Sequence, residues 1–284
     1  MVVFVSYDRR MNTSTSRPSS PTIIITGASA GIGEVAAREL AGEARVIIVG
    51  RSPATKTIAD ELGLEYFRAD FSNLDSVRKL AADLLVACPQ IDLLINNAGG
   101  ILKSVSDTDD GFEATFQVNY LAQFLLTDLL MERLIASDAG IINTSSAANL
   151  GARLLPANVQ MAGNPFGAYC NSKLLDLIHA KELSRRFGSQ GIMAVSFHPG
   201  VVATSFASQT TGLFASMYNT FLKRFLKTPL EGADTMLWLA RNRNDWVAGG
   251  YYANRKIARS HKLAQDDAAM RKIWSDTQEL LATV

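Results

Sequence analysis

The sequence is poor in the groups that mark disulfide-rich, metal-binding or nucleic-acid-binding proteins. Its 284 residues include only two cysteines, Cys88 and Cys170, so the chain is no disulfide scaffold and a reducing cytoplasm is the expected location. A net charge of +1 gives no reason to expect nucleic acid or an acidic partner. His179 and His261 have no cysteine or carboxylate companions at ligand spacing, so no metal site is expected.

Long apolar runs are missing as well. No run approaches the roughly 18 to 20 residues that a bilayer-spanning helix needs, which predicts a protein without a transmembrane segment. Residues 1–5 are apolar but lack the basic flank and the length of a signal peptide. Residues 12–21 are polar and proline-bearing, so we expect residues 1–20 to form a mobile tail and residues 21–284 to form a single domain.

What the chain does contain is a regular alternation of apolar, strand-like runs with longer helical segments. Strands are expected at 22–26, 45–50, 64–69, 91–96, 139–145, 191–198 and 249–252. Helices are expected at 73–87, 110–135 and 167–188, among others. Repeated β-α units predict the α/β class, here a single Rossmann-type doubly wound parallel sheet of about seven strands with helices on both faces. Ligands would then gather at the carboxyl ends of the strands.

A glycine-rich turn follows the first expected strand. It reads G-A-S-A-G-I-G over residues 27–33 and leads into a helix-favouring stretch. Glycines let the backbone approach a pyrophosphate closely, and the N–H groups that begin a helix attract the anion. The alternative is a tight turn without a ligand, but its place between strand and helix favours nucleotide binding. The residues expected to contact the nucleotide are Gly27, Ser29, Gly31, Ile32 and Gly33.

A tyrosine and a lysine lie one helical turn apart in the run A-Y-C-N-S-K. The four-residue spacing places Tyr169 and Lys173 side by side on one helix face. A held cation favours the ionised form of a phenol and so lowers its pKa toward the range that acid–base catalysis needs. The alternative is a packed ring beside a solvated lysine stem, and the other motifs of the chain decide against it.

Six motifs, taken in order, resemble those of the short-chain dehydrogenase/reductase family in its short, single-domain form. They are T-G-A-S-A-G-I-G (26–33), N-N-A-G (96–99), Asn119, I-I-N-T-S-S (141–146), Y-C-N-S-K (169–173) and H-P-G-V-V-A-T (198–204). The resemblance covers residues 20–260. Within the family the chain looks most like the retinol-dehydrogenase-like branch.

The resemblance implies four catalytic residues. Tyr169 would be the general acid in reduction and the base in oxidation, and Lys173 would bond the nicotinamide ribose and stabilise the tyrosinate. Ser146, with Ser145 as its rival, would bond and orient the substrate oxygen. Asn119 would hold a water that relays protons to solvent, or it would distort its helix by bonding the backbone.

The same resemblance implies further cofactor contacts in the turns after the fourth and sixth strands. The first turn would line the adenosine pocket, and the second would meet the nicotinamide carboxamide or the pyrophosphate. The residues are Asn97, Ala98 and Gly99 in the first turn and Pro199, Gly200, Val202 and Thr204 in the second.

The choice between NAD and NADP depends on the end of the second strand. A carboxylate there would accept the ribose hydroxyls of NAD, whereas a guanidinium would pair with the extra phosphate of NADP. Arg51 and Ser52 occupy this place without an acidic residue, which favours NADP while NAD stays open. Arg51 as a solvated loop residue is the alternative, and Ala30 stands where many NADP-preferring relatives carry a second basic residue. Asp70 matches an adenine-contacting aspartate, or alternatively caps the helix from Asn73.

Two segments are expected to shape the substrate pocket. Ser146 and Tyr169 are 23 positions apart, which leaves residues 150–167 to form one wall. Residues 205–226 are rich in aromatic side chains, and we expect them to form a lid rather than part of the core. An apolar cleft of this kind suits a small hydrophobic aldehyde, ketone or alcohol.

Three functions are compatible with the sequence. The first is an NADP-dependent carbonyl reductase or alcohol dehydrogenase, which the full set of catalytic residues favours. The second is a non-catalytic NADP-binding redox sensor, and the third is a reductase of a C=C bond or a sugar epimerase on the same scaffold. The expected assembly is a homodimer or homotetramer, because relatives pair through the helices at 110–135 and 167–188.

Overall fold

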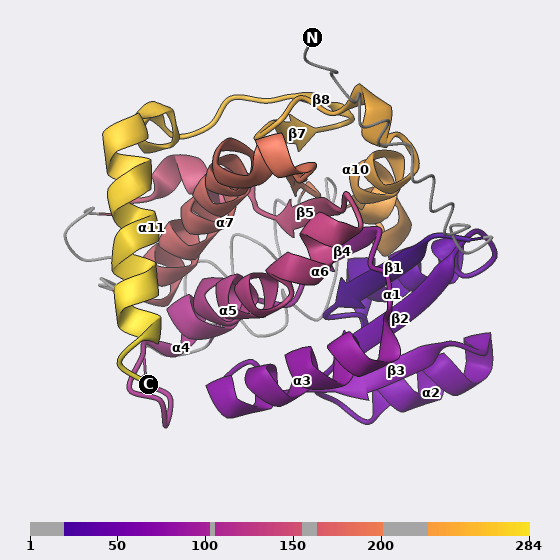
Figure 1. Ribbon diagram of the computed structural model, residues 1–284. Helices are drawn as coiled ribbons and strands as arrows, with labels where there is room; N and C mark the ends of the chain where they lie inside the picture. Colours follow the sequence, from indigo (N-terminus) through magenta and orange to yellow (C-terminus); the bar gives the residue numbers. More distant parts are fainter. Residues whose placement is uncertain (1–19, 103–105, 155–163, 201–226) are drawn as a thin grey trace, which may run out of the picture.

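A central sheet lies between two layers of helices (Figure 1). The computed structural model describes residues 20–102, 106–154, 164–200 and 227–284. The alternating β-α pattern of the sequence folds as a Rossmann-type doubly wound sheet, so the expected fold class is confirmed.

The sheet, in the described residues, has eight strands in the order β3-β2-β1-β4-β5-β6-β7-β8. Their bounds are β1 Thr22–Thr26, β2 Arg45–Gly50, β3 Glu65–Arg68, β4 Leu93–Asn96, β5 Gly140–Thr144, β6 Met193–His198, β7 Tyr251–Ala253 and β8 Lys256–Ile257. Neighbours from β3 to β7 pair in parallel, and β8 pairs antiparallel with β7. The carboxyl ends of the parallel strands therefore share one edge of the sheet.

The eighth strand is one more than the sequence predicts. It has two residues, Lys256 and Ile257, and both are exposed, so no alternating pattern marks it. The two residues before it, Asn254 and Arg255, have positive φ angles of 49° and 61°. Consecutive positive φ angles give the tight turn that joins antiparallel strands with the correct twist. The turn geometry, rather than hydrophobicity, creates this edge strand.

The central strands bury both faces. Ile24 packs into the core beneath α3, α5 and α7, whereas Ile23 and Ile25 pack into the core beneath α1 and α10. All three side chains are at most 4% exposed. Burial on both faces explains why this strand reads as an unbroken apolar run.

The helices divide between these two faces. On the first are α3 (Leu74–Ala87), α4 (Ala114–Phe116), α5 (Ala122–Leu129), α6 (Met131–Ala136), α7 (Pro165–Phe187) and α11 (Asp267–Leu281). On the second are α1 (Gly31–Leu40), α2 (Ala54–Leu62) and α10 (Pro229–Arg241). Two of the expected helices, at 73–87 and 167–188, match α3 and α7 to within two residues at each end.

The helix expected at 110–135 is divided into several parts. It begins at Ala114 because the carboxylate of Glu113 accepts the N–H groups of Thr115 and Phe116 and so caps the first turn. A π-helical turn, η1 (Gln117–Leu121), then joins α4 to α5. Such turns are rare and are frequently found at functional sites, and this one contains Asn119.

The C-terminal helix α11 packs against α7 (Figure 1). Trp274, which is 4% exposed, lies with its ring centroid 4.7 Å from that of Phe124 on α5 and 6.2 Å from that of Phe187 on α7. A buried hydrogen bond of 2.9 Å joins the hydroxyls of Tyr120 and Thr277. The chain's own last helix thus packs over part of α7 and contacts α5.

We expect Trp274→Ala to destabilise the fold by about 3 to 5 kcal/mol, because it leaves a cavity between three helices. Urea unfolding followed by circular dichroism would measure this loss. Val86→Ala is the control, since the Val86 side chain is 88% exposed and its truncation should change stability by less than about 0.5 kcal/mol. Equal stability of the two variants would show that α11 contributes little to the fold.

Candidate active site

The described site residues lie at the carboxyl edge of the sheet and on the elements next to it. They are Gly27, Ser29, Gly31, Ile32 and Gly33 after β1, Arg51 and Ser52 after β2, Asp70 after β3, Asn97, Ala98 and Gly99 after β4, Ser146 after β5, and Pro199 and Gly200 after β6. Asn119 lies in η1, and Tyr169 and Lys173 lie on α7. Val202, Thr204 and the expected lid at 205–226 fall outside the described residues, as does half of the expected pocket wall.

The glycine loop packs directly against the turn that follows β4. Gly27 has a φ angle of +66°, and a Cβ atom on it would lie 2.7 Å from the Cα atom of Ala98. A Cβ atom on Gly33 would lie 2.5 Å from Nδ2 of Asn97. Both positions therefore require glycine, the first for its backbone conformation and both for the close approach.

Hydrogen bonds connect these two turns. The Asn97 side-chain amide donates to the carbonyl of Thr26 at 3.0 Å. The Thr26 hydroxyl accepts the backbone N–H groups of Asn97 and Ala98 at 2.9 and 3.0 Å. The expected contribution of Asn97 and Ala98 to the cofactor pocket thus has a structural basis, since they set the position of the loop.

The start of α1 has the features of an anion site. Its N-cap is Ala30, whose side chain has no group that could bond the N–H groups of the first turn. Gly31 has a φ angle of +64°, which turns the backbone into the helix. Helix N–H groups without a side-chain cap, next to a glycine turn, fit a pyrophosphate, so the residues present suit a dinucleotide.

Arg51 stands at the exposed end of β2, close to Asp70. Its guanidinium is 72% exposed and lies 3.7 Å from the Asp70 carboxylate, which is itself 41% exposed. Asp70 accepts bonds from the backbone and hydroxyl of Ser72, whereas the side chain of Asn73 caps α3. The alternative role of Asp70 as the helix cap is therefore wrong.

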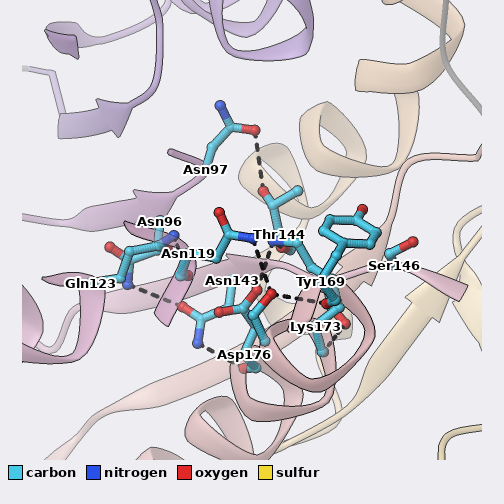
Figure 2. Close-up of polar contacts among 12 residues, drawn as sticks. Asn96, Asn97, Asn119, Gln123, Asn143, Thr144, Ser146, Tyr169, Lys173 and Asp176 are labelled. Atoms are coloured by element: carbon cyan, nitrogen blue, oxygen red, sulfur yellow. Dashed lines mark hydrogen bonds and ion pairs between the residues drawn. The ribbon is translucent and has the colours of Figure 1, made fainter. Parts of the chain in front are cut away.

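Tyr169 and Ser146 face each other at the carboxyl end of β5 (Figure 2). The Tyr169 ring is 7% exposed, and burial raises the pKa of its phenol above the ordinary value. The nearby Ser146 hydroxyl opposes that rise. Ser145 instead donates its hydroxyl to the carbonyl of Lys173 at 2.6 Å, so the geometry favours Ser146 over Ser145 as the partner of the phenol.

Lys173 is held by two acceptors. Its ammonium donates to the carbonyl of Thr144 and to the carboxylate of Asp176, each at 2.8 Å, and lies 5.8 Å from the centre of the Tyr169 ring (Figure 2). None of the sequence motifs indicates Asp176. Its signal was a lone acidic residue in the apolar stretch L-L-D-L-I, three positions after the lysine.

Asn119 ties η1 to its surroundings. Its amide nitrogen donates to the Gly100 carbonyl and to the Ser172 hydroxyl, both at 3.0 Å, and its amide oxygen accepts the N–H of Gly100 at 2.9 Å. Its backbone carbonyl accepts a bond of 2.7 Å from Gln123. The expected alternative of an asparagine that bonds backbone within a distorted helix is thus present in the structure.

A line of buried polar groups runs beneath the site. The Asn96 amide donates to the side-chain oxygen of Asn143 at 3.0 Å. Asn143 in turn donates to the backbone carbonyl of Asp176 at 3.0 Å and lies 3.2 Å from Nδ1 of His179. Burial lowers the pKa of His179 to about 3, so this imidazole is neutral. Among the described residues no three His, Cys, Asp or Glu side chains gather as a metal site would require.

Comparison with known families identifies this arrangement. A family model described as short chain dehydrogenase matches residues 21–212. The chain belongs to the short-chain dehydrogenase/reductase family. The matched residues include the glycine loop, Ser146, Tyr169 and Lys173.

Similar proteins indicate the branch of the family to which the chain belongs. The chain is 38% identical over 265 residues to a Streptomyces protein named as a daunorubicin C-13 ketoreductase, covering 89% of this chain and 90% of that protein. It is 33% identical over 273 residues to human retinol dehydrogenase 12, covering 91% and 85%. As the sequence predicts, this short-chain dehydrogenase/reductase belongs to the retinol-dehydrogenase-like branch and acts on CH–OH or C=O groups with a nicotinamide cofactor.

Solved structures agree with the fold. A crystal structure of an uncharacterised protein from Mycobacterium paratuberculosis has a TM-score of 0.73 at 27% identity, covering 92% of this chain and 95% of that chain. A short-chain dehydrogenase/reductase from Caenorhabditis elegans, solved with cofactor, has a TM-score of 0.64 at 24% identity, covering 81% and 91%. None of the helices in the described parts of the chain has the length and apolarity that crossing a membrane requires.

We expect His179 to make the fold sensitive to acid. Its pKa of about 3 in the folded protein lies below the unfolded value near 6.5, so the stability it contributes is fully present above about pH 6.5 and is lost as the pH falls toward 3. Urea unfolding at pH 7 and pH 4.5 gives the free energy of unfolding at each pH. The decrease between pH 7 and pH 4.5 should be about 2 to 3 kcal/mol larger in the wild type than in His179→Phe.

His261→Asn is the control for this experiment. His261 is less buried and caps the helical turn η6 (Lys262–Gln265), a role that asparagine can keep. This variant should keep most of the wild-type acid sensitivity, and an equal loss in wild type and His179→Phe would contradict the assignment to His179.

Proposed function

We propose that this enzyme is an NADP-dependent carbonyl reductase or alcohol dehydrogenase for a small hydrophobic substrate, with Tyr169 as its general acid and base. The observation that carries the proposal is the Ser146 hydroxyl close to the buried Tyr169 phenol, with the Lys173 ammonium 5.8 Å from the same ring. A donor, a proton source and a cation beside the glycine loop are what hydride transfer to a carbonyl needs.

Each side chain has a role in this proposal. The nicotinamide supplies the hydride when bound. Ser146 orients the substrate oxygen by a hydrogen bond, and Tyr169 gives that oxygen a proton in reduction or takes one in oxidation. Lys173 binds the ribose of the cofactor, and Asn119 keeps η1 in place beside it. The relay of protons through a water at Asn119 stays a prediction.

The proposed preference for NADP rests on Arg51. Its guanidinium is largely exposed at the end of β2, with the Ser52 side chain next to it, and is therefore accessible to a 2′-phosphate. The contact with Asp70 spans 3.7 Å between two exposed groups and is weak enough to yield to a phosphate. NAD is the alternative cofactor.

The names of the relatives support a hydrophobic substrate. One is named as a daunorubicin C-13 ketoreductase and others as retinol dehydrogenases. In this chain Ala152 and Leu154 are buried in the described part of the expected pocket wall. We propose that residues 205–226 complete the pocket as a lid on the single domain of residues 21–284, with residues 1–20 as a tail.

Assembly and location are also proposals. A homodimer or homotetramer would pair through surfaces other than the outer faces of α5 and α7, since α11 packs over them. Light scattering would report the mass. The two cysteines are free and buried, which supports the reducing cytoplasm, and cell fractionation would test it.

The non-catalytic NADP sensor and the C=C reductase are the competing functions. Fluorescence titration with NADPH and NADH, followed by absorbance assays against aldehydes, ketones and retinoids, separates them. Tight NADPH binding with oxidation by a carbonyl supports the proposal, and product analysis distinguishes C=O from C=C reduction. Tight binding without turnover would favour the sensor, and a failure to bind either nucleotide would overturn the proposal.

We expect Tyr169→Phe to lower kcat by about 10²- to 10⁴-fold, because it removes the proton-transferring hydroxyl and little else. The Kd for NADPH should change by less than about threefold, since the ring stays in place. Tyr66→Phe is the matched control, because this tyrosine lies on β3 away from Ser146 and Lys173. Near-normal turnover in Tyr169→Phe would refute the mechanism.

We expect Arg51→Asp to lower kcat/KM for NADPH by about tenfold or more and to improve use of NADH, because a carboxylate repels the 2′-phosphate and accepts ribose hydroxyls. Steady-state assays with both cofactors measure the ratio. Arg78→Asp, which changes a half-buried arginine on α3, should leave the ratio as it is. An unchanged ratio in Arg51→Asp would show that the phosphate is held elsewhere.

A further inference from the structure

The Lys173–Asp176 ion pair differs from the surface ion pairs of this enzyme in its burial. Its side chains are 6% and 3% exposed at a separation of 2.8 Å. The Arg38–Glu61 pair, by comparison, has 35% and 57% exposure. Moving two charges out of water costs more than a simple contact returns, so a buried pair next to a reactive group points to a role beyond stability.

The pair fixes the direction of the ammonium. A lysine has three N–H donors, and two of those on Lys173 are directed to the Thr144 carbonyl and the Asp176 carboxylate. One donor is left, and the Tyr169 ring lies 5.8 Å away. The strand β5 and the helix α7 thereby hold the cation from two sides, so its position does not depend on a flexible four-carbon stem.

The pair also changes the charge that the phenol experiences. The Asp176 carboxylate raises the pKa of Tyr169, in the same direction as the larger effect of burial. Lys173 alone would favour the tyrosinate, and a carboxylate 2.8 Å from its ammonium offsets that effect. Burial raises the pKa of Asp176 itself to about 6 despite the nearby lysine, so the carboxylate is charged above about pH 6.

The other groups around Asp176 are neutral and do not balance the charge of Lys173. His179, on the same helix, is held neutral by burial. Tyr120, from η1, is a buried phenol whose pKa is raised above its ordinary value, and Asp176 contributes to that rise. The strand β5 presents the neutral Asn143 and the Thr144 carbonyl. Cys170 and Tyr251 also act on the Tyr169 phenol, and burial raises the pKa of both, so both are neutral at neutral pH. Lys173 and Asp176 are therefore the pair of opposite charges closest to this phenol in the described part of the site.

We propose that Asp176 is a positioning residue of the active site, which anchors the Lys173 ammonium and compensates its charge. The proposal rests on the function proposed above for Tyr169 and Lys173. Asp176 would keep Lys173 aimed toward the phenol and the cofactor ribose while limiting how strongly the cation favours the tyrosinate. The pH at which Tyr169 exchanges its proton would then be set by three side chains on α7 rather than by two.

The test removes the charge and keeps the shape. Asp176→Asn retains an oxygen acceptor for Lys173 but no negative charge. NMR of protein labelled with carbon-13 at tyrosine Cζ, with the Tyr169 signal identified by its loss in Tyr169→Phe, follows ionisation without any need for turnover. We expect Tyr169 in Asp176→Asn to ionise about one pH unit lower than in the wild type, because a nearby negative charge that opposed ionisation is gone.

Activity provides a second readout. In Asp176→Asn the pH profile of kcat should shift to lower pH both for oxidation, which needs the tyrosinate, and for reduction, which needs the phenol. Asp176→Glu keeps the charge and should restore the wild-type profile. Glu182→Gln removes another buried carboxylate of α7, one that pairs with Arg185 and Arg186, and should leave the Tyr169 signal where it is.

The outcomes separate the two proposals. If the Tyr169 signal shifts in Asp176→Asn while the wild-type protein shows no turnover, the result supports the role of Asp176 in placing charge and rejects the proposed enzyme function. Normal turnover, with a Tyr169 signal and a kcat profile that behave identically in wild type and Asp176→Asn, would overturn the role of Asp176. If Asp176→Asn does not fold, Asp176→Ser, which leaves room for a water beside Lys173, takes its place in both measurements.

Discussion

The contact between the glycine loop and the turn after β4 is the constraint on which the site depends. Gly27 and Gly33 approach Ala98 and Asn97 so closely that a single Cβ atom would collide. This approach brings the carboxyl ends of β1 and β4 together and leaves the first turn of α1 without a side-chain cap. The nucleotide site is therefore a consequence of backbone packing, and the side chains of the catalytic group are arranged around it.

The proposed catalytic residues are supported by polar residues inside the protein. Asn96, Asn143 and His179 connect β4, β5 and α7 through hydrogen bonds at depths where an unpaired polar group would be costly. Lys173 and Asp176 add a buried ion pair to this layer. Such a layer is expensive in stability, but its bonds are directional, and they fix where α7 places the Tyr169 phenol relative to Ser146.

The packing of α11 against α7 also helps to fix the position of α7. Trp274 packs among aromatic side chains of α5 and α7, on the side away from the sheet. The helix that carries Tyr169 and Lys173 is thus packed between the sheet and α11, which restricts its movement.

The sequence by itself determined the fold class, the family and the positions of the glycine loop, Ser146, Tyr169 and Lys173, because each depends on local spacing along one strand or helix. It did not determine β8, because its two residues pair with β7 only as a result of the tight turn at Asn254 and Arg255. The division of the helix at 110–135 and the partnership of Asp176 with Lys173 were also decided by tertiary structure. Packing buried Asp176 against Lys173, and no local pattern in the sequence records that packing.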